Sequence, residues 1–143
     1  MTQVGNVLRI PADLGKLADM RQFVREQAAQ LGADGEAIDD IVTAVDELVT
    51  NSIVHGYRGA EGTVEVEVEA SNGSVLVRLR DEAPAFDPTK VPDPDVTLPL
   101  ELRPKGGMGI YLSLQATDGL AYRRTDTGNE LTLSKQLTSG KGD

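Results

Sequence analysis

The chain has 143 residues, of which 39% are hydrophobic, and its 14 basic and 23 acidic residues give a formal net charge of −9. This length fits one globular domain with a real core, and the acidic balance argues against direct contact with nucleic acid or an anionic membrane surface. The lack of cysteine excludes disulfides and thiolate metal sites. No apolar run is long enough for a membrane span and no signal-peptide pattern is visible, so we expect a cytoplasmic protein.

The first half of the chain predicts one strand and two helices. Residues 3–10 have the composition of a short strand. A proline and an aspartate then open a helical segment that extends to about residue 31, with apolar residues at helical spacing. Glycines in residues 32–35 end it. A second helix is predicted over residues 36–55, with one continuous apolar stripe and glycines at 56 and 59 beyond its end.

The pattern then changes to the two-residue period of β-strands. Valine and glutamate alternate over residues 63–70, Asn72-Gly73 is a strong hairpin turn, and residues 74–81 form the returning strand. Arginines 78 and 80 should face the glutamates, which would contribute a few tenths of a kcal/mol per pair, up to about 1. A second hairpin is predicted over residues 119–137, with its turn at 126–128.

Between the hairpins, residues 84–104 hold six of the seven prolines and show no helical or strand period. Segments of this length inside a compact domain are usually functional or disordered. A glycine turn and a short helix over residues 110–116 follow it. The sequence therefore predicts a single α+β domain over residues 1–137, a two-layer sandwich with a mostly antiparallel, mixed sheet and helices on one face. Residues 138–143 form a polar tail.

Three residues of the second predicted helix are spaced by four and share one face: Glu47, Asn51 and His55. A carboxylate one turn from an amide oxygen suits Mg²⁺. The alternative is an ordinary solvated helix face, and His55 alone fits a helix C-cap.

Asp81 ends a strand whose residues 75, 77 and 79 are apolar, so alternation turns its carboxylate toward the helices. A carboxylate there needs a hydrogen-bond donor, and the amine of a bound base would be one. The alternative is an aspartate that caps the backbone of the following loop.

Gly106, Gly107 and Gly109, with Met108 between them, precede the short helix, and Lys105 stands beside them. Backbone N–H groups of such a turn can approach a phosphate at a helix N-terminus. The turn is not a Walker motif, because the Gly-Lys-Ser/Thr ending is missing.

The order of these motifs resembles a known superfamily. Glu47, Asn51 and the following His55-Gly56-Tyr57, then Asp81 with Phe86-Asp87-Pro88, then the glycine turn are similar to the ATPases shared by gyrase, heat-shock chaperones, sensor histidine kinases and MutL. The chain most resembles the bacterial anti-sigma-factor serine/threonine kinases, over nearly its whole length.

The resemblance implies a Bergerat-type ATP-binding fold and a role for each motif. Asn51 corresponds to the Mg²⁺ ligand, Glu47 to the general base, and Asp81 to the acceptor of the adenine amino group. Gly106, Gly107, Met108 and Gly109 correspond to the phosphate-binding turn, Lys105 to an arginine directed at the terminal phosphate, and residues 83–104 to the ATP lid.

Three positions depart from the family pattern. Ala83 replaces a glycine, and its methyl group would crowd the adenine edge if the backbone there had a positive φ. Lys105 keeps the charge of the arginine without its two-pronged contact. A threonine that many relatives place on the last strand corresponds to Glu130.

The resemblance thus implies a kinase that uses ATP and Mg²⁺ to phosphorylate an anti-anti-sigma protein and that sequesters a sigma factor. The alternative is a nucleotide-gated module that binds its partner without useful phosphoryl transfer. A sensor histidine kinase is a third interpretation, and it would need an acceptor histidine on another chain. A homodimer is left open.

Overall fold

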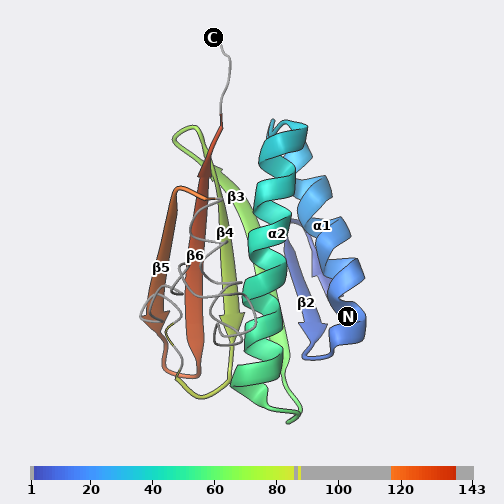
Figure 1. Ribbon diagram of the computed structural model, residues 1–143, viewed down its shortest axis with the longest axis vertical. Coiled ribbons are helices and arrows are strands. Elements are labelled where there is room, and N and C mark those ends of the chain that lie inside the picture. The colour runs from blue at the N-terminus through green and yellow to red at the C-terminus, as the bar shows by residue number, and fades with distance from the viewer. Residues whose placement is uncertain (1, 86, 88–116, 138–143) are drawn as a thin grey trace, which may run out of the picture.

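The computed structural model describes residues 2–85, 87 and 117–137. Six strands form one sheet in the order β1-β2-β3-β4-β6-β5, with every described pairing antiparallel, and two helices cover one face (Figure 1). The elements are β1 Thr2–Val4, β2 Val7–Pro11, α1 Leu17–Gln30, α2 Gly35–Asn51, β3 Thr63–Ser71, β4 Ser74–Asp81, β5 Gly119–Arg124 and β6 Asn129–Gln136. The predicted two-layer α+β architecture is confirmed.

The predicted helix over residues 110–116 and most of the 83–104 segment lie outside the described residues. Within the part of the chain that the structure describes, no helix is long and apolar enough to cross a membrane.

The single strand predicted over residues 3–10 is wrong, because the chain reverses there and forms the β1–β2 hairpin. Gly5 adopts a φ of +59°, which is accessible to glycine at no steric cost. Asn6 ties the turn to β3, since its side-chain amide donates to the carbonyl of Val68 at 2.9 Å.

The core lies between the sheet and the helices. Alternate residues of β3 and β4 are buried on the helix-facing side, as the alternation predicts: Val64, Val66 and Val68, and Val75, Val77 and Leu79. Helix α2 contributes Ile41, Val45 and Leu48, which are almost fully buried. Each such side chain stabilises the fold by roughly 1.5–3 kcal/mol through removal from water. Asp34 caps the start of α2 by accepting from the backbone N–H of Ala37 at 2.8 Å.

The end of α2 differs from the predicted continuous helix over residues 36–55. The regular helix stops at Asn51, and a π-helical turn, η2 Ser52–Tyr57, follows it. Arg58 then adopts the left-handed conformation, with φ of +53°, and so ends the helical segment in place of the predicted His55 cap. Asn51 is buried and His55 is exposed. The two residues that were predicted to share one helix face therefore have different surroundings.

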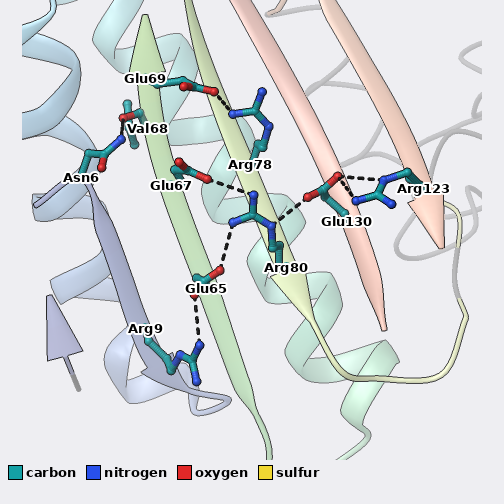
Figure 2. A network of polar contacts seen from close by, with 10 residues as sticks. All are labelled: Asn6, Arg9, Glu65, Glu67, Val68, Glu69, Arg78, Arg80, Arg123 and Glu130. Carbon is teal, nitrogen blue, oxygen red and sulfur yellow. Dashed lines mark hydrogen bonds and ion pairs between the residues drawn. The ribbon is translucent and has the colours of Figure 1, made fainter. Parts of the chain in front are cut away.

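The face of the sheet opposite the helices carries the predicted pairing of glutamates with arginines (Figure 2). Arg80 on β4 is hydrogen-bonded to Glu65 and Glu67 of β3, each at 3.0 Å, and to Glu130 of β6 at 2.8 Å. Arg123 adds a second ion pair to Glu130 at 3.1 Å. Although burial opposes its ionisation, the hydrogen bonds from Arg80 and Arg123 hold the pKa of Glu130 below its ordinary value.

The network predicts an acid-sensitive contribution to stability. A carboxyl whose pKa is lower in the folded protein stabilises it above the unfolded pKa of about 4.5, and this stabilisation is lost as the pH falls through the lowered folded pKa. Glu130→Gln should therefore reduce the free energy of unfolding by about 1–3 kcal/mol at pH 7. Below pH 4.5, the free energy of unfolding of this variant should fall less steeply with pH than that of the wild type.

Urea unfolding at a series of pH values between 7 and 3 measures the two effects. Glu69→Gln is the control: Glu69 pairs with Arg78 and is 36% exposed, so its loss should cost at most about 1 kcal/mol. Equal pH profiles for wild type and Glu130→Gln would contradict the assignment.

Candidate functional site

Asp81, the last residue of β4, points toward the helices, as strand alternation predicts. One carboxylate oxygen, Oδ2, accepts from the hydroxyl of Ser52 at 2.6 Å. The other, Oδ1, accepts from the backbone N–H of Ala83 at 3.1 Å and from the side-chain amide of Asn129 at 2.8 Å. Asp81 thus caps the following backbone, which was the alternative interpretation, while its predicted role as acceptor for a bound base stays a prediction. Its carboxylate has about four acceptor positions, and these three bonds leave one on Oδ2.

Asn129, the first residue of β6, lies directly opposite Asp81 in the antiparallel pairing and is 5% exposed. Glu130, which the resemblance matched to the threonine of the last strand, lies on the opposite face of the sheet with Arg80. Residue 129 has the same strand parity as the buried Leu131 and Leu133. That parity was the signal in the sequence that could have identified Asn129.

Tyr57 joins the end of η2 to the strands beside the site. Its hydroxyl donates to the carbonyl of Thr63 at 2.6 Å and accepts from the backbone N–H of Glu82 at 2.8 Å. Burial, together with the nearby charge of Asp81, raises the pKa of the Tyr57 phenol above its ordinary value. The phenol therefore stays neutral and keeps its proton for Thr63. Neither Tyr57 nor Ser52 was predicted as part of the site.

The three candidate residues predicted on one helix face differ in their surroundings. Asn51 is 9% exposed, and its side-chain nitrogen Nδ2 is buried without a hydrogen-bond partner. Glu47, one turn earlier, is partly buried. The structure brings Asn51 into the same cleft as Asp81. Glu47 is not among the residues that line this cleft, and His55 is exposed on the surface.

This cleft is narrow. It is lined by Leu48, Asn51, Ser52, Gly56, Asp81, Asn129 and Leu131. Its free volume of about 10 Å³ holds about one water molecule, so a larger ligand must lie at its open side or part its walls. A hollow of about 250 Å³ lies over the other face of the sheet, beside Arg80 and Glu130. Its arginines are ion-paired to Glu65 and Glu130, and Asp81 and Glu82 also line it, which leaves little positive charge for an anionic ligand.

Ala83 occupies the position where the family pattern has glycine. Its backbone is not among those with a positive φ, so the condition under which its methyl group would crowd the site is not met. The side chain is 1% exposed and faces Gly56, where an added Cβ would lie 3.1 Å from that of Ala83. Ala83 and Gly56 are thus matched in size.

The remaining predicted site residues lie outside the described residues: Lys105, Gly106, Gly107, Met108 and Gly109. Within the described ranges, no group of three or more acidic or histidine side chains is arranged to hold a metal ion.

Comparison with known proteins agrees with this architecture. The family model described as a histidine kinase-like ATPase domain matches residues 10–135. Two solved structures share the fold. The RsbU and RsbW domains of a Mycobacterium tuberculosis protein superpose with a TM-score of 0.61 at 23% identity, over 92% of this chain and 32% of that one. The Acinetobacter baumannii histidine kinase AdeS gives 0.50 at 13% identity, over 92% and 68%.

Curated relatives narrow the class. An anti-sigma F factor of Clostridium botulinum is 39% identical over 76% of this chain and 78% of its own length, and one of Thermoanaerobacter is 33% identical over 85% of each. The serine-protein kinase RsbW of Bacillus cereus is 25% identical over 91% of this chain and 83% of its own. The chain therefore belongs to the histidine kinase-like ATPase family, in the branch of the anti-sigma-factor serine/threonine kinases.

The close approach of the β5–β6 turn to Asp81 predicts a steric requirement at Gly128. A Cβ on Gly128 would overlap the carbonyl oxygen of Asp81 and the Cα of Glu82. Because backbone rather than a flexible side chain would have to move, Gly128→Ala should lower the free energy of unfolding by about 1–3 kcal/mol. Gly35→Ala is the control: no atom lies within 4 Å of its added Cβ, so stability should be unchanged or slightly raised. Chemical denaturation measures both, and equal stabilities would contradict the close approach.

Proposed function

We propose that this protein binds Mg-ATP in the cleft between α2 and the end of β4 and transfers the terminal phosphoryl group to a serine or threonine of a partner protein. One observation carries the proposal. The buried Nδ2 of Asn51 has no partner in the described structure, and Asn51 lines the same cleft as Asp81. A buried donor without a partner costs about 1–3 kcal/mol, and a bound ligand with acceptor oxygens would remove that cost.

Asp81 would select the base. Its one remaining acceptor position, on Oδ2, suits the exocyclic amine of adenine, while the ionised carboxylate has no proton to offer the carbonyl of guanine. The hydrogen bonds from Ser52, Ala83 and Asn129 hold the carboxylate in place before the nucleotide arrives. Such preorganisation reduces the free energy lost on binding.

Glu47 and Asn51 would serve the phosphates. The oxygen of Asn51 would hold Mg²⁺, and the ion would neutralise charge on the phosphates. Glu47 would accept the proton of the attacking hydroxyl while the P–O bond to that oxygen forms and ADP departs. In the same proposal, Lys105 and the turn at Gly106, Gly107, Met108 and Gly109 would contact the phosphates.

The names of the relatives suggest the partners. Similar chains are called anti-sigma F factor and serine-protein kinase RsbW, and we therefore propose an anti-anti-sigma protein as phosphorylation substrate and a sigma factor as the sequestered partner. The alternative is a nucleotide-gated binding module without significant kinase activity. The departures from the family pattern at Lys105 and Ala83 were the features that favoured this alternative. Ala83 is buried and has no positive φ, so it does not support the alternative.

Nucleotide binding should raise the melting temperature selectively. A ligand that binds the native state at 100 times its Kd stabilises it by about 2.7 kcal/mol, and Mg-ATP and Mg-ADP should therefore raise the melting temperature by several degrees. Mg-GTP should do less, because it presents a carbonyl to Asp81. Differential scanning fluorimetry makes the comparison. Asp81→Asn should reduce the difference, and equal shifts from ATP and GTP in the wild type would remove Asp81 from this role.

Substitutions on α2 should separate metal binding from proton transfer. Glu47→Gln should leave the Kd for Mg-ATP largely intact and lower phosphoryl transfer by about 10²- to 10⁴-fold, the usual contribution of a general base. Asn51→Ala should instead weaken the dependence of ATP binding on Mg²⁺. Thr43→Ala, at an exposed position of α2, is the control and should change neither.

Transfer of radiolabel from ATP to a candidate anti-anti-sigma protein, together with calorimetric binding, gives both readouts. Normal transfer by Glu47→Gln would defeat the base assignment, and ATP binding without any transfer by the wild type would favour the binding module.

A further inference from the structure

We propose that Asn129 is the positioning residue that makes Asp81 selective for an amino-bearing base. The inference rests on the proposed function, in which Asp81 receives the 6-amino group of adenine, and it adds a residue on β6 that sets this preference without having to touch the base. Asn129 is 5% exposed, so its polar atoms must find their partners within the protein.

The hydrogen bonds of Asn129 fix its orientation. Its Nδ2 faces three oxygen atoms: Oδ1 of Asp81 at 2.8 Å, the carbonyl of Ala83 at 3.2 Å and the carbonyl of Pro84 at 3.1 Å. Its Oδ1 faces two donors, the hydroxyl of Tyr122 at 2.5 Å and Nη1 of Arg124 at 3.5 Å. Rotating the amide by half a turn would place like atoms against each other at both ends.

This fixed amide in turn fixes the carboxylate. Asn129 and the N–H of Ala83 occupy Oδ1 of Asp81, and Ser52 occupies one position of Oδ2. Turning the carboxylate plane away from this orientation would break these bonds, so the carboxylate offers the cleft one acceptor in one direction. A base with an amine at that point can donate to this oxygen. A base with a carbonyl there would place its own acceptor oxygen against the acceptor oxygen of Asp81, and the two would repel.

Asn129 also holds the chain where it leaves β4. It donates to the carbonyls of Ala83 and Pro84, and Arg124 donates to the carbonyl of Ala83 at 2.9 Å. The first residues of β6 therefore set the position of both the carboxylate and the backbone next to it. A residue that acts only on stability would change the affinity for all nucleotides by the same factor, whereas this residue should change the ratio between two bases.

The decisive comparison uses the full chain with Mg-ATP and Mg-inosine triphosphate, in which a carbonyl replaces the 6-amino group and the adjacent N1 carries a hydrogen. Asn129→Asp is the sharpest variant, because its carboxylate beside Asp81 would cause the pair to retain a proton, and a protonated Asp81 can donate to the inosine carbonyl. Wild type should prefer ATP at least about tenfold, and Asn129→Asp should reduce that ratio about tenfold, with a larger reduction at lower pH.

Two further variants distinguish a loss of positioning from a general folding defect. Tyr122→Phe keeps the ring and removes the donor to Oδ1 of Asn129, so it should reduce the ratio by about two- to fivefold. Thr132→Val, on the same strand opposite Arg78, should leave the ratio unchanged. Calorimetric Kd values at pH 6 and pH 8 supply the ratios.

A wild-type ratio retained in both Asn129→Asp and Tyr122→Phe would overturn the positioning role while leaving ATP binding by Asp81 in place. Absence of ATP binding by the wild-type protein would overturn the proposed function itself, and this inference with it.

Discussion

The architecture of the site depends on one constraint, the need to supply hydrogen bonds to a carboxylate that faces the helix layer. Asp81 receives donors from the π-helical turn, from the backbone beyond β4 and from β6. A partly buried carboxylate without such donors would cost several kcal/mol or take up a proton. The helix end, the strand end and the last hairpin are therefore held in one arrangement, and the cleft beside Asp81 exists because all three meet there.

Much of the fold could be predicted from local patterns. The valine and glutamate alternation specified which face of β3 is buried, and Asn72-Gly73 specified the turn, with φ of +51° and +82° as such hairpins require. The β1–β2 hairpin was missed because Gly5 interrupts a run whose composition reads as continuous strand. The π-helical turn after Asn51 was missed because an apolar stripe with a period of 3.6 carries no signal for one wider turn.

The site residues that could be predicted are those whose positions follow from a pattern within one strand or one helix. Strand parity turned Asp81 inward, and helical spacing placed Glu47 and Asn51 on one side of α2. Asn129 was missed because its contact is with Asp81, a residue 48 positions away in the sequence, and because attention fell on the neighbouring Glu130, which lies on the other face of the sheet. A shift of one residue along a strand exchanges the two faces of the sheet.

The strand order has a consequence for how the protein is made. Strand β4 lies between β3 and β6, so its second edge stays open until residues 129–136 have left the ribosome. During that interval, the unpaired N–H and C=O groups of β4 can pair with other chains, and the long separation between β4 and β6 slows their joining. Because Asn129 completes the donors of Asp81, nucleotide could help folding only after the last hairpin has docked. Newly made chains would therefore depend on rapid docking of that hairpin, or on a chaperone, to avoid aggregation.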